Sequence, residues 1–400
     1  MEYRMNLRKI GIMIHRFRLQ KRSALYRDDF SPDGFLISSL RFPFFDVQPG
    51  FPVCSRGTLL HLEQGRAIQE EELYRFFLRK LDLQYAYSPL AEKRYQQFIA
   101  AFCGLITDGS LSELKHLKLP VPNANCLLYA FYDRLLSTLM LYYTEAAFPA
   151  IELMEEISDL WFCVPENLRP ITRIFVLTAQ CAHPFYDCID SKPLMLQHPT
   201  HPLDLLCFSF AAAIQQRYIL SDKILARYDQ RPLRGELPRM LHTWLRYYKG
   251  ATTHRPRRYT SMLIIDATHP LEDLLGHATV FMLGKHALMH REFTLARLYF
   301  SILENKGEPW GIFAAFIAQR PYPKESPENP KLKYLTVYLN EYYLARPQDR
   351  LAYLIRQLLP CLKQNEEFLR IYLRFEVIDL VRKTQCYKYV YEYLIKSEIL

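Results

Sequence analysis

The stretch VCSRGTLLHLEQGR, residues 53–66, predicts a short helix with one apolar side and one polar side. Ser55 is a suitable N-cap, because its hydroxyl can accept a hydrogen bond from the free amides of the first turn. Leu59 and Leu62 are spaced so that both lie on the side of the helix that would face a core. Gly65 favours an end to the helix, because glycine adopts the left-handed backbone at the least steric cost. The leucines would therefore hold the helix on the protein and leave its polar side facing outward.

The polar side chains of this stretch are those that a helix in a DNA groove would use. Near the N-terminus of a recognition helix, such groups reach the edges of bases in the major groove. Arg66 follows the helix and would add attraction to a phosphate. The residues that would face bases are Ser55, Arg56, Thr58 and His61. An ordinary amphipathic surface helix is the other interpretation, and the stretch by itself allows both.

Residues 6–22 predict a longer amphipathic helix whose outer faces are basic. The apolar positions recur at the spacing of a helix with one buried face, and they are Leu7, Ile10, Ile14 and Phe17. The basic residues in and before this segment are Arg4, Arg8, Lys9, Arg16, Arg18, Lys21 and Arg22, and the acidic one is Glu2. Because Lys and Arg release counterions from nucleic acid, Arg16, Arg18 and Lys21 are candidates for phosphate contacts. A solvated charged face is the plainer alternative.

Between these two helices, the sequence predicts a turn. The letters SPDG at residues 31–34 combine Pro32, which presets φ, Asp33, which can bond its own backbone, and Gly34, which tolerates positive φ. The alternating flanks indicate a small β-hairpin. The proline-rich segment that follows disfavours regular structure up to about residue 53. After Gly65, the letters QEEELYRFFLRKLDL at residues 69–83 predict a further amphipathic helix.

The order of these segments resembles the helix-turn-helix of the phage-repressor or XRE family. The matching features are a basic first helix containing IGxxI, an E-E-L segment in the last helix, and, between them, Cys54, Ser55, Arg56, Thr58, Leu59, Leu62, Glu63 and Gly65. The resemblance implies that residues 1–85 form a DNA-binding domain with Ser55, Arg56, Thr58 and His61 at the DNA face. Family members have a short helix opening G-L-[ST]-Q before the recognition helix, and the segment between Ala24 and Cys54 lacks that motif. A degenerate domain that only dimerises is the alternative.

Residues 86–400 contain one helical pattern after another, separated by short breakers. Repeated helix pairs of this kind are typical of a solenoid. Residues 277–310 resemble one tetratricopeptide repeat, with Leu283, Gly284, Ala296 and Phe300 in register and Pro309 one position late. We therefore expect a mainly α fold. A small helix-turn-helix domain, with a short β-hairpin inserted, would precede a tetratricopeptide-like array over residues 86–400.

Arrays of this kind bind ligands on a concave surface lined by the first helix of each pair. In the repeat at residues 277–310, this surface would include Phe281, Lys285 and Met289. The ammonium group of Lys285 could hold the carboxylate of a peptide. An ordinary surface lysine is the alternative interpretation.

The composition is that of a globular protein in a reducing compartment. Half of the 400 residues are hydrophobic, 23% are charged, and the net charge of +9 is compatible with an anionic partner. The nine cysteines occur singly, which indicates free thiols. The N-terminus lacks the apolar segment of a secretory signal, and Asp133 and Arg134 interrupt the most apolar run. We expect a cytoplasmic protein without a membrane partner.

The sequence offers little for catalysis or cofactor binding. His286 and His290 have the i,i+4 spacing of metal ligands on a helix, but the glutamate of the HExxH motif is missing. The residue types of a zinc site also occur, at unfamiliar spacing, in Cys181, His183, Cys188, His198 and His201. There is no glycine-rich phosphate loop and no motif for a catalytic serine or cysteine. We therefore expect no enzyme, no metal and no cofactor.

Together, the two resemblances indicate one class of protein. An XRE-type head followed by a tetratricopeptide-like array is similar to the layout of the Rgg, PlcR and PrgX type of peptide-responsive transcription regulators. This resemblance implies a homodimer that binds a palindromic promoter in double-stranded DNA. It also implies a short signalling peptide that binds the array and shifts the DNA-binding heads. The alternative is a helical-repeat interaction module whose head no longer binds DNA.

Overall fold

The computed structural model describes residues 7–25, 28–37, 50–84, 88–120, 126–146, 151–182, 201–253, 269–304, 310–322, 330–342, 345–361 and 367–388. Within these ranges the regular elements are all helices, apart from an isolated β-bridge between Ile37 and Pro52. The mainly α fold class is thereby confirmed. None of the described helices combines the length and the apolar character needed to cross a membrane.

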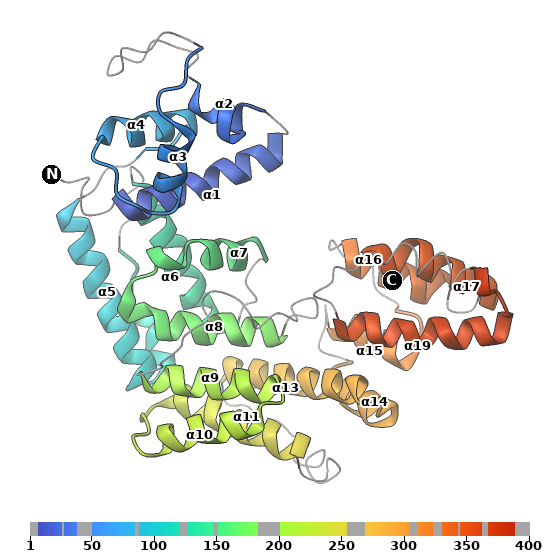
Figure 1. Cartoon of the computed structure of the whole chain (residues 1–400). Coiled ribbons are helices and arrows are strands. Elements are labelled where there is room, and N and C mark those ends of the chain that lie inside the picture. The colour runs from blue at the N-terminus through green and yellow to red at the C-terminus, as the bar shows by residue number, and fades with distance from the viewer. Residues whose placement is uncertain are drawn as a thin grey trace. The chain divides into compact units, whose positions relative to one another are not determined.

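The described residues divide into two compact units, the first ending at Arg173 and the second beginning at Ile174. Figure 1 labels their helices along the chain. The first unit contains α1 (Leu7–Leu25), η1 (Asp28–Phe30), α2 (Pro32–Leu36), α3 (Arg56–Glu63), α4 (Glu71–Lys80), α5 (Pro89–Thr107), η2 (Leu111–His116), α6 (Leu127–Glu145), α7 (Ile151–Asp159), η3 (Trp161–Cys163) and η4 (Glu166–Leu168). The helix α8 (Arg169–Ala182) begins in the first unit and ends in the second.

The second unit is also built from helices over its described residues. Two of its short elements, η6 and η7, are π-helical segments that continue neighbouring helices. The unit contains α9 (Pro202–Ile214), α10 (Tyr218–Asp229), α11 (Glu236–Thr253), α13 (Pro270–Met289), α14 (Phe293–Ile302), α15 (Trp310–Ala318), α16 (Pro330–Val337), η6 (Tyr338–Tyr342), α17 (Pro347–Tyr353), η7 (Leu354–Leu358), α18 (Leu359–Cys361) and α19 (Glu367–Thr384).

The first four α-helices pack around one apolar core. The long helix α1 contacts α3 and α4, and the short helix α2 contacts α3. Ile10 and Ile14 of α1 are buried, as are Leu59 and Leu62 of α3. Side chains at these spacings lie on one face of a helix, so each helix presents an apolar stripe to the core. As a result, α3 is held on the protein by its leucine side.

The SPDG segment begins a helix, so the predicted hairpin turn is wrong. Ser31 is the N-cap of α2, and its hydroxyl oxygen accepts a hydrogen bond of 3.1 Å from an amide of the first turn. Pro32 and Asp33 suit this position because a first-turn residue needs no amide hydrogen and the helix N-terminus attracts negative charge. The same residues also suit a turn. The helix is supported by Phe35, whose ring stacks on Phe77 with the centroids 4.9 Å apart.

The first unit extends well past residue 85, which the sequence predicts as a domain boundary. The Lys9 ammonium donates to the Tyr132 hydroxyl at 3.3 Å, and Arg16 pairs with Asp159 at 2.6 Å. These contacts join α1 to segments more than a hundred positions away in the sequence. A local pattern cannot reveal such contacts, and the compact unit runs to Arg173.

Two helical hairpins in the second unit begin with the same short sequence. His201, Pro202 and Leu203 open α9, while His269, Pro270 and Leu271 open α13. In both helices the histidine Nδ1 accepts a hydrogen bond from the leucine amide, at 3.2 Å in α9 and 3.1 Å in α13. The helix α9 packs against α10 and α13 packs against α14, with a left-handed residue in each connecting turn. A repeated sequence thus begins a repeated helical hairpin.

The hairpin of α13 and α14 coincides with the segment that resembles a tetratricopeptide repeat. Gly284 of α13 approaches α14 so closely that a Cβ atom there would lie 2.7 Å from the Phe300 ring. Ala296 of α14 is fully buried. These small residues allow the close approach of two helices that the repeat requires. The extension of this pattern into an array over the rest of the chain stays a prediction.

Candidate nucleic-acid interface

The helix α3 has the local structure that its sequence predicts. It spans Arg56–Glu63, and the Ser55 hydroxyl oxygen accepts a hydrogen bond of 3.1 Å from an amide of the first turn. Gly65 follows the helix with a φ of +73°. The serine cap and the glycine end are therefore confirmed, and the helix N-terminus carries an ordered hydroxyl at the protein surface.

The polar side of α3 faces outward. Arg56 exposes 69% of its side chain, and its guanidinium lies 3.9 Å from the carboxylate of Asp33, which is also exposed. An exposed ion pair at this distance contributes little stability. The other residues predicted to meet DNA here are Ser55, His61 and Arg66, which are exposed, and Thr58, which is half-buried. The contact with Asp33 could not be predicted, because nothing local indicates that α2 packs beside α3.

Arg18 is buried, so its assignment to a phosphate-contacting surface is wrong. Its side chain is 4% exposed, and Nε and Nη2 donate to the two carboxylate oxygens of Glu63 at 2.5 and 2.8 Å. Nη1 donates to the carbonyl oxygen of Phe30 at 2.9 Å. This bidentate pairing suits a buried site, because it satisfies both charged groups at once. Arg18 therefore ties α1 to the last residue of α3.

Glu63 is held in its charged form at the base of α3. Burial alone would raise the pKa of its carboxyl, but hydrogen bonds from His15 and Arg18 and the guanidinium charge outweigh burial and hold the pKa below its ordinary value. The Nδ1 atom of His15 lies 2.9 Å from Glu63 Oε2. This role was not predicted from the sequence, although the position of Glu63 beside Leu62 places it near the inward side of the helix.

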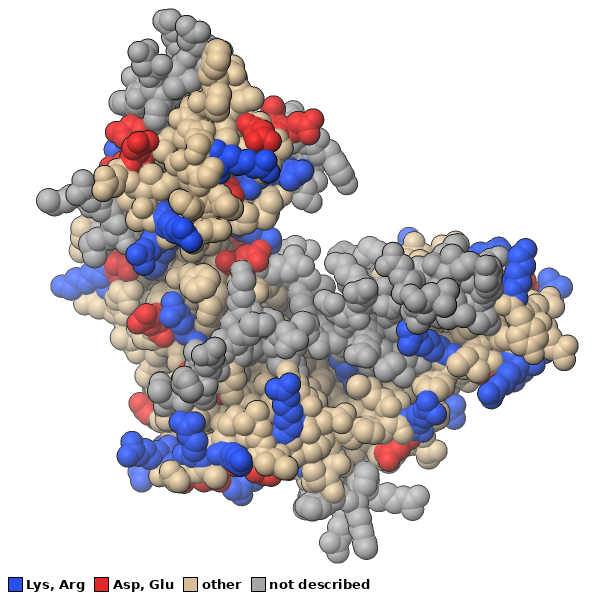
Figure 2. Space-filling view, viewed as in Figure 1, with Lys and Arg blue, Asp and Glu red and all other residues tan. Residues whose placement is uncertain are grey.

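Arg16 and Lys21 are engaged in ion pairs. Arg16 Nη1 lies 2.6 Å from Asp159, and Lys21 Nζ lies 2.7 Å from Asp82. These contacts direct both positive charges toward carboxylates of the protein itself. The exposed bases among the described residues of α1 are Arg8 and Arg22. On the face of the first unit seen in Figure 2, basic and acidic side chains are interspersed, so the described residues of that face form no continuous basic patch.

Two of the three residues predicted to line a peptide groove lie inside the second unit. Phe281 is fully buried, and Lys285 is 3% exposed with its ammonium 5.5 Å from the centre of the Phe281 ring. Their assignment to an open concave surface is wrong, because α13 contacts α11, α14 and α19 and is covered on several sides. Met289, near the end of α13, is 43% exposed and stays available to a ligand.

His286 of α13 and His290, the C-cap residue that follows the helix, lie close together. The rings of His286 and His290 have centroids 4.4 Å apart, and burial together with the charge of His290 lowers the pKa of His286 to about 4. His286 is therefore neutral near pH 7. Over the described part of the chain, no three His, Cys, Asp or Glu side chains gather as they would around a metal ion. Three of the residues considered above as zinc ligands lie outside the described residues, namely His183, Cys188 and His198.

The residues around α3 form the best-defined candidate site of the first unit. The helix is anchored by buried leucines and a buried ion pair, while its capped N-terminus and Arg56 are open to solvent. No protein-family model, no curated protein and no solved structure matches the chain. The candidate interface therefore rests on the residues of α3 and on their geometry.

Proposed function

We propose that the protein is a DNA-binding transcription regulator that reads base edges with the outward side of α3. The single observation that carries this proposal is the exposed position of Arg56 on a serine-capped helix that is rigidly held from beneath. A recognition helix needs both properties, because its side chains must enter the major groove while its backbone keeps a fixed orientation. The short helix α2 also occupies, in chain order, the place of the helix that precedes the recognition helix in XRE-type proteins.

Each group on this surface has a distinct role in the proposal. Arg56 and His61 would contact base edges, because a guanidinium can donate two hydrogen bonds to guanine and an imidazole can donate or accept one. Arg66 and Arg8, whose main chains lie close together beside Gly65, would contact phosphates of the DNA backbone. The contact between Arg56 and Asp33 would be given up on binding, at little cost for an exposed pair.

The proposed regulator acts as a homodimer on a palindromic site and responds to a short peptide, as the resemblance to Rgg-type proteins implies. Two α3 helices related by a two-fold axis would read two half-sites about one helical turn apart. Because Phe281 and Lys285 are buried, a peptide would bind elsewhere on the second unit, and Met289 is the candidate that is still exposed.

Binding-site selection from random DNA with the purified full chain tests the proposal directly. We expect one enriched motif with two-fold symmetry. Affinity for mixed genomic DNA should fall steeply between low and moderate salt, because phosphate contacts release counterions. If no motif is enriched and no DNA binds at low salt, the protein is instead the helical interaction module that its sequence also allows.

Replacing Arg56 by alanine should weaken binding to the selected site by about 1–3 kcal/mol, because one base-reading side chain is lost. Binding to unrelated DNA should change much less, so sequence specificity falls. The measurement is fluorescence anisotropy with a labelled duplex at fixed salt. Arg297→Ala removes an exposed arginine from α14 in the second unit and is the matched control. Equal affinities of the Arg56→Ala and Arg297→Ala variants for the selected site would contradict the assignment.

A further inference from the structure

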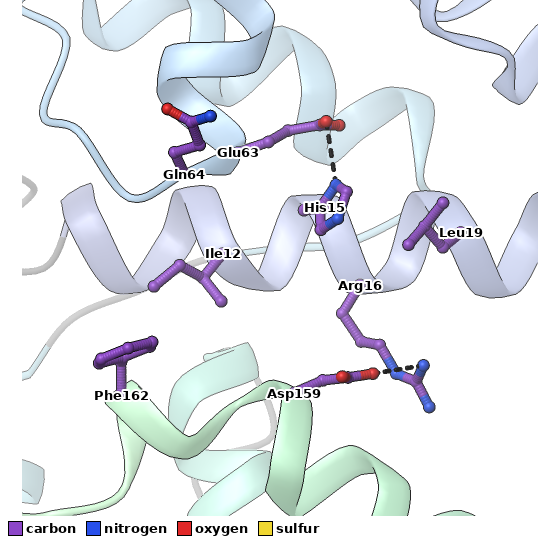
Figure 3. Close-up of a pocket in the computed structure, with 8 residues that line it drawn as sticks. All are labelled: Ile12, His15, Arg16, Leu19, Glu63, Gln64, Asp159 and Phe162. Atoms are coloured by element: carbon purple, nitrogen blue, oxygen red, sulfur yellow. Dashed lines mark ion pairs between the residues drawn. The ribbon is translucent and has the colours of Figure 1, made fainter. Parts of the chain in front are cut away.

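A pocket of about 230 Å³ opens in the first unit beneath the end of α3. Figure 3 shows it between α1 and the segment that joins α7 to η3. A cavity of about 150 Å³ is enough to bind benzene, so this pocket has room for a small apolar group and a polar arm. Apolar and polar side chains both line the pocket.

The apolar lining comes from both walls of the pocket. Ile12 and Leu19 contribute from α1, and Phe162 contributes from η3 on the opposite wall (Figure 3). Phe162 is 59% exposed, and Leu19 is also partly exposed. When a ligand covers apolar surface that is exposed on both sides of a pocket, the free energy falls, because that surface is removed from water. The pocket therefore favours a ligand with an aliphatic or aromatic part.

The polar lining places opposite charges side by side. Arg16 and Asp159 form their 2.6 Å ion pair at one end of the pocket, and the Asp159 side chain is 41% exposed (Figure 3). His15 lies nearby with its Nδ1 atom 2.9 Å from Glu63. In its neutral form an imidazole ring offers one nitrogen as a hydrogen-bond acceptor.

The charges around the pocket cancel in pairs. Arg16 balances Asp159, and Arg18 balances Glu63 through its bidentate contact. A ligand with a single charge would leave an uncompensated charge in a half-enclosed site, which is unfavourable. A ligand that carries one positive and one negative group matches the arrangement. Such a ligand can place its cation at Asp159, beside the His15 ring, and its anion at Arg16.

We propose that this pocket binds a free α-amino acid with an apolar side chain. Its carboxylate would face Arg16, its ammonium would face Asp159 and His15, and its side chain would cover Ile12, Leu19 and Phe162. The ligand would also contact Glu63, the last residue of the helix that we propose for DNA binding. The site itself does not depend on that function, because it is defined by the pocket alone.

Calorimetric titration of the full chain tests the proposal with probes that differ by one group. L-leucine and L-phenylalanine are the zwitterionic probes. Isopentylamine and 4-methylpentanoate are leucine without its carboxylate and without its amine, and glycine lacks the apolar arm. We expect one zwitterion to bind per chain, at least about 10-fold tighter than any of the three truncated probes, because each lost charge-assisted hydrogen bond or apolar contact weakens binding. Absence of binding by both apolar amino acids, or equal binding of a singly charged probe, overturns the proposal.

Two variants locate the binding. Asp159→Asn removes the charge that faces the ammonium, and we expect it to weaken binding by about 10-fold or more. Glu166→Gln makes the same chemical change at an exposed carboxylate on η4, outside the pocket lining, and should leave binding unchanged. Thermal unfolding of both variants checks that the first unit is intact. Phe162→Ala provides a second test that leaves the ion pair in place, and wild-type affinity in both pocket variants would place any ligand elsewhere.

Discussion

The variant Arg18→Met is expected to lower the free energy of unfolding of the first unit by about 3–5 kcal/mol, because it leaves the charge of Glu63 buried without its partner. Methionine keeps most of the side-chain volume, so the loss reports on the charge rather than on a cavity. Hydrogen exchange at the amides of α1 and α3 measures this free energy for the first unit alone. The same measurement tests our reassignment of Arg18 from a DNA contact to a structural residue.

A matched control lies on the same helix. Arg22 is exposed near the end of α1, and Arg22→Met should change the free energy of unfolding by no more than about 0.5 kcal/mol. If the two variants had equal effects, the buried pair would not be a main contact between α1 and α3.

The dependence on pH gives a second signature of the pair. The pKa of Glu63 is lower in the folded chain than its ordinary value, so the stability from its charged form is present above the unfolded pKa of about 4.3. That stability is lost as the pH falls through the lower folded pKa. In the Arg18→Met variant, burial raises the pKa of Glu63, and the carboxyl takes up a proton as the pH is lowered. The difference in the free energy of unfolding between the wild type and the variant should therefore shrink as the pH is lowered from about 7 to about 4.

The variant Gly11→Ala is expected to lower the free energy of unfolding of the first unit by about 1–3 kcal/mol or more, because a methyl group at this position collides with the main chain of α3. A Cβ atom on Gly11 would overlap the carbonyl oxygen of Leu62. Backbone cannot rotate away as a side chain can, so α1 and α3 would have to separate. Hydrogen exchange in α3 should accelerate, and affinity for the selected DNA site should fall with it.

Another helical glycine supplies the control for this prediction. Gly104 lies in α5, and a Cβ atom added to it would have no neighbouring atom within 4 Å, so a methyl group there meets open space. Gly104→Ala should stabilise the first unit by about 0.5–1 kcal/mol, because alanine favours the helix over glycine. We expect Gly11→Ala to lower the free energy of unfolding and Gly104→Ala to raise it. A change in the same direction for both variants would contradict the close approach of α1 to α3.

The helix α3 could be predicted in detail because its determinants are local. The serine cap, the glycine end and the two inward leucines all lie within the stretch of residues 53–66. Capping hydrogen bonds and helical periodicity operate over three or four positions, so they do not depend on the remaining chain. The close approach at Gly284 was predictable for a similar reason, since the repeat motif sets the spacing of its two helices.

Whether an individual charged side chain is buried or exposed could not be predicted in this way. Arg18 and Lys285 are basic residues on amphipathic patterns, and both patterns are compatible with a solvated side chain. Arg18 is buried because Glu63, far along the chain, meets it with both oxygens. Lys285 is buried because other helices cover α13. The candidate amino-acid pocket likewise brings α1 next to Asp159 and Phe162, which no sequence motif connects.

The amino-acid sequence by itself determined the helical class of this protein and the register of α3, since hydrogen bonds and side-chain spacing along one helix settle both. Only the tertiary structure decided which charges face water, where the first compact unit ends and which residues enclose a pocket. The physical reason is that burial and ion pairing depend on contacts between segments distant in the chain, and local propensity carries no information about those contacts.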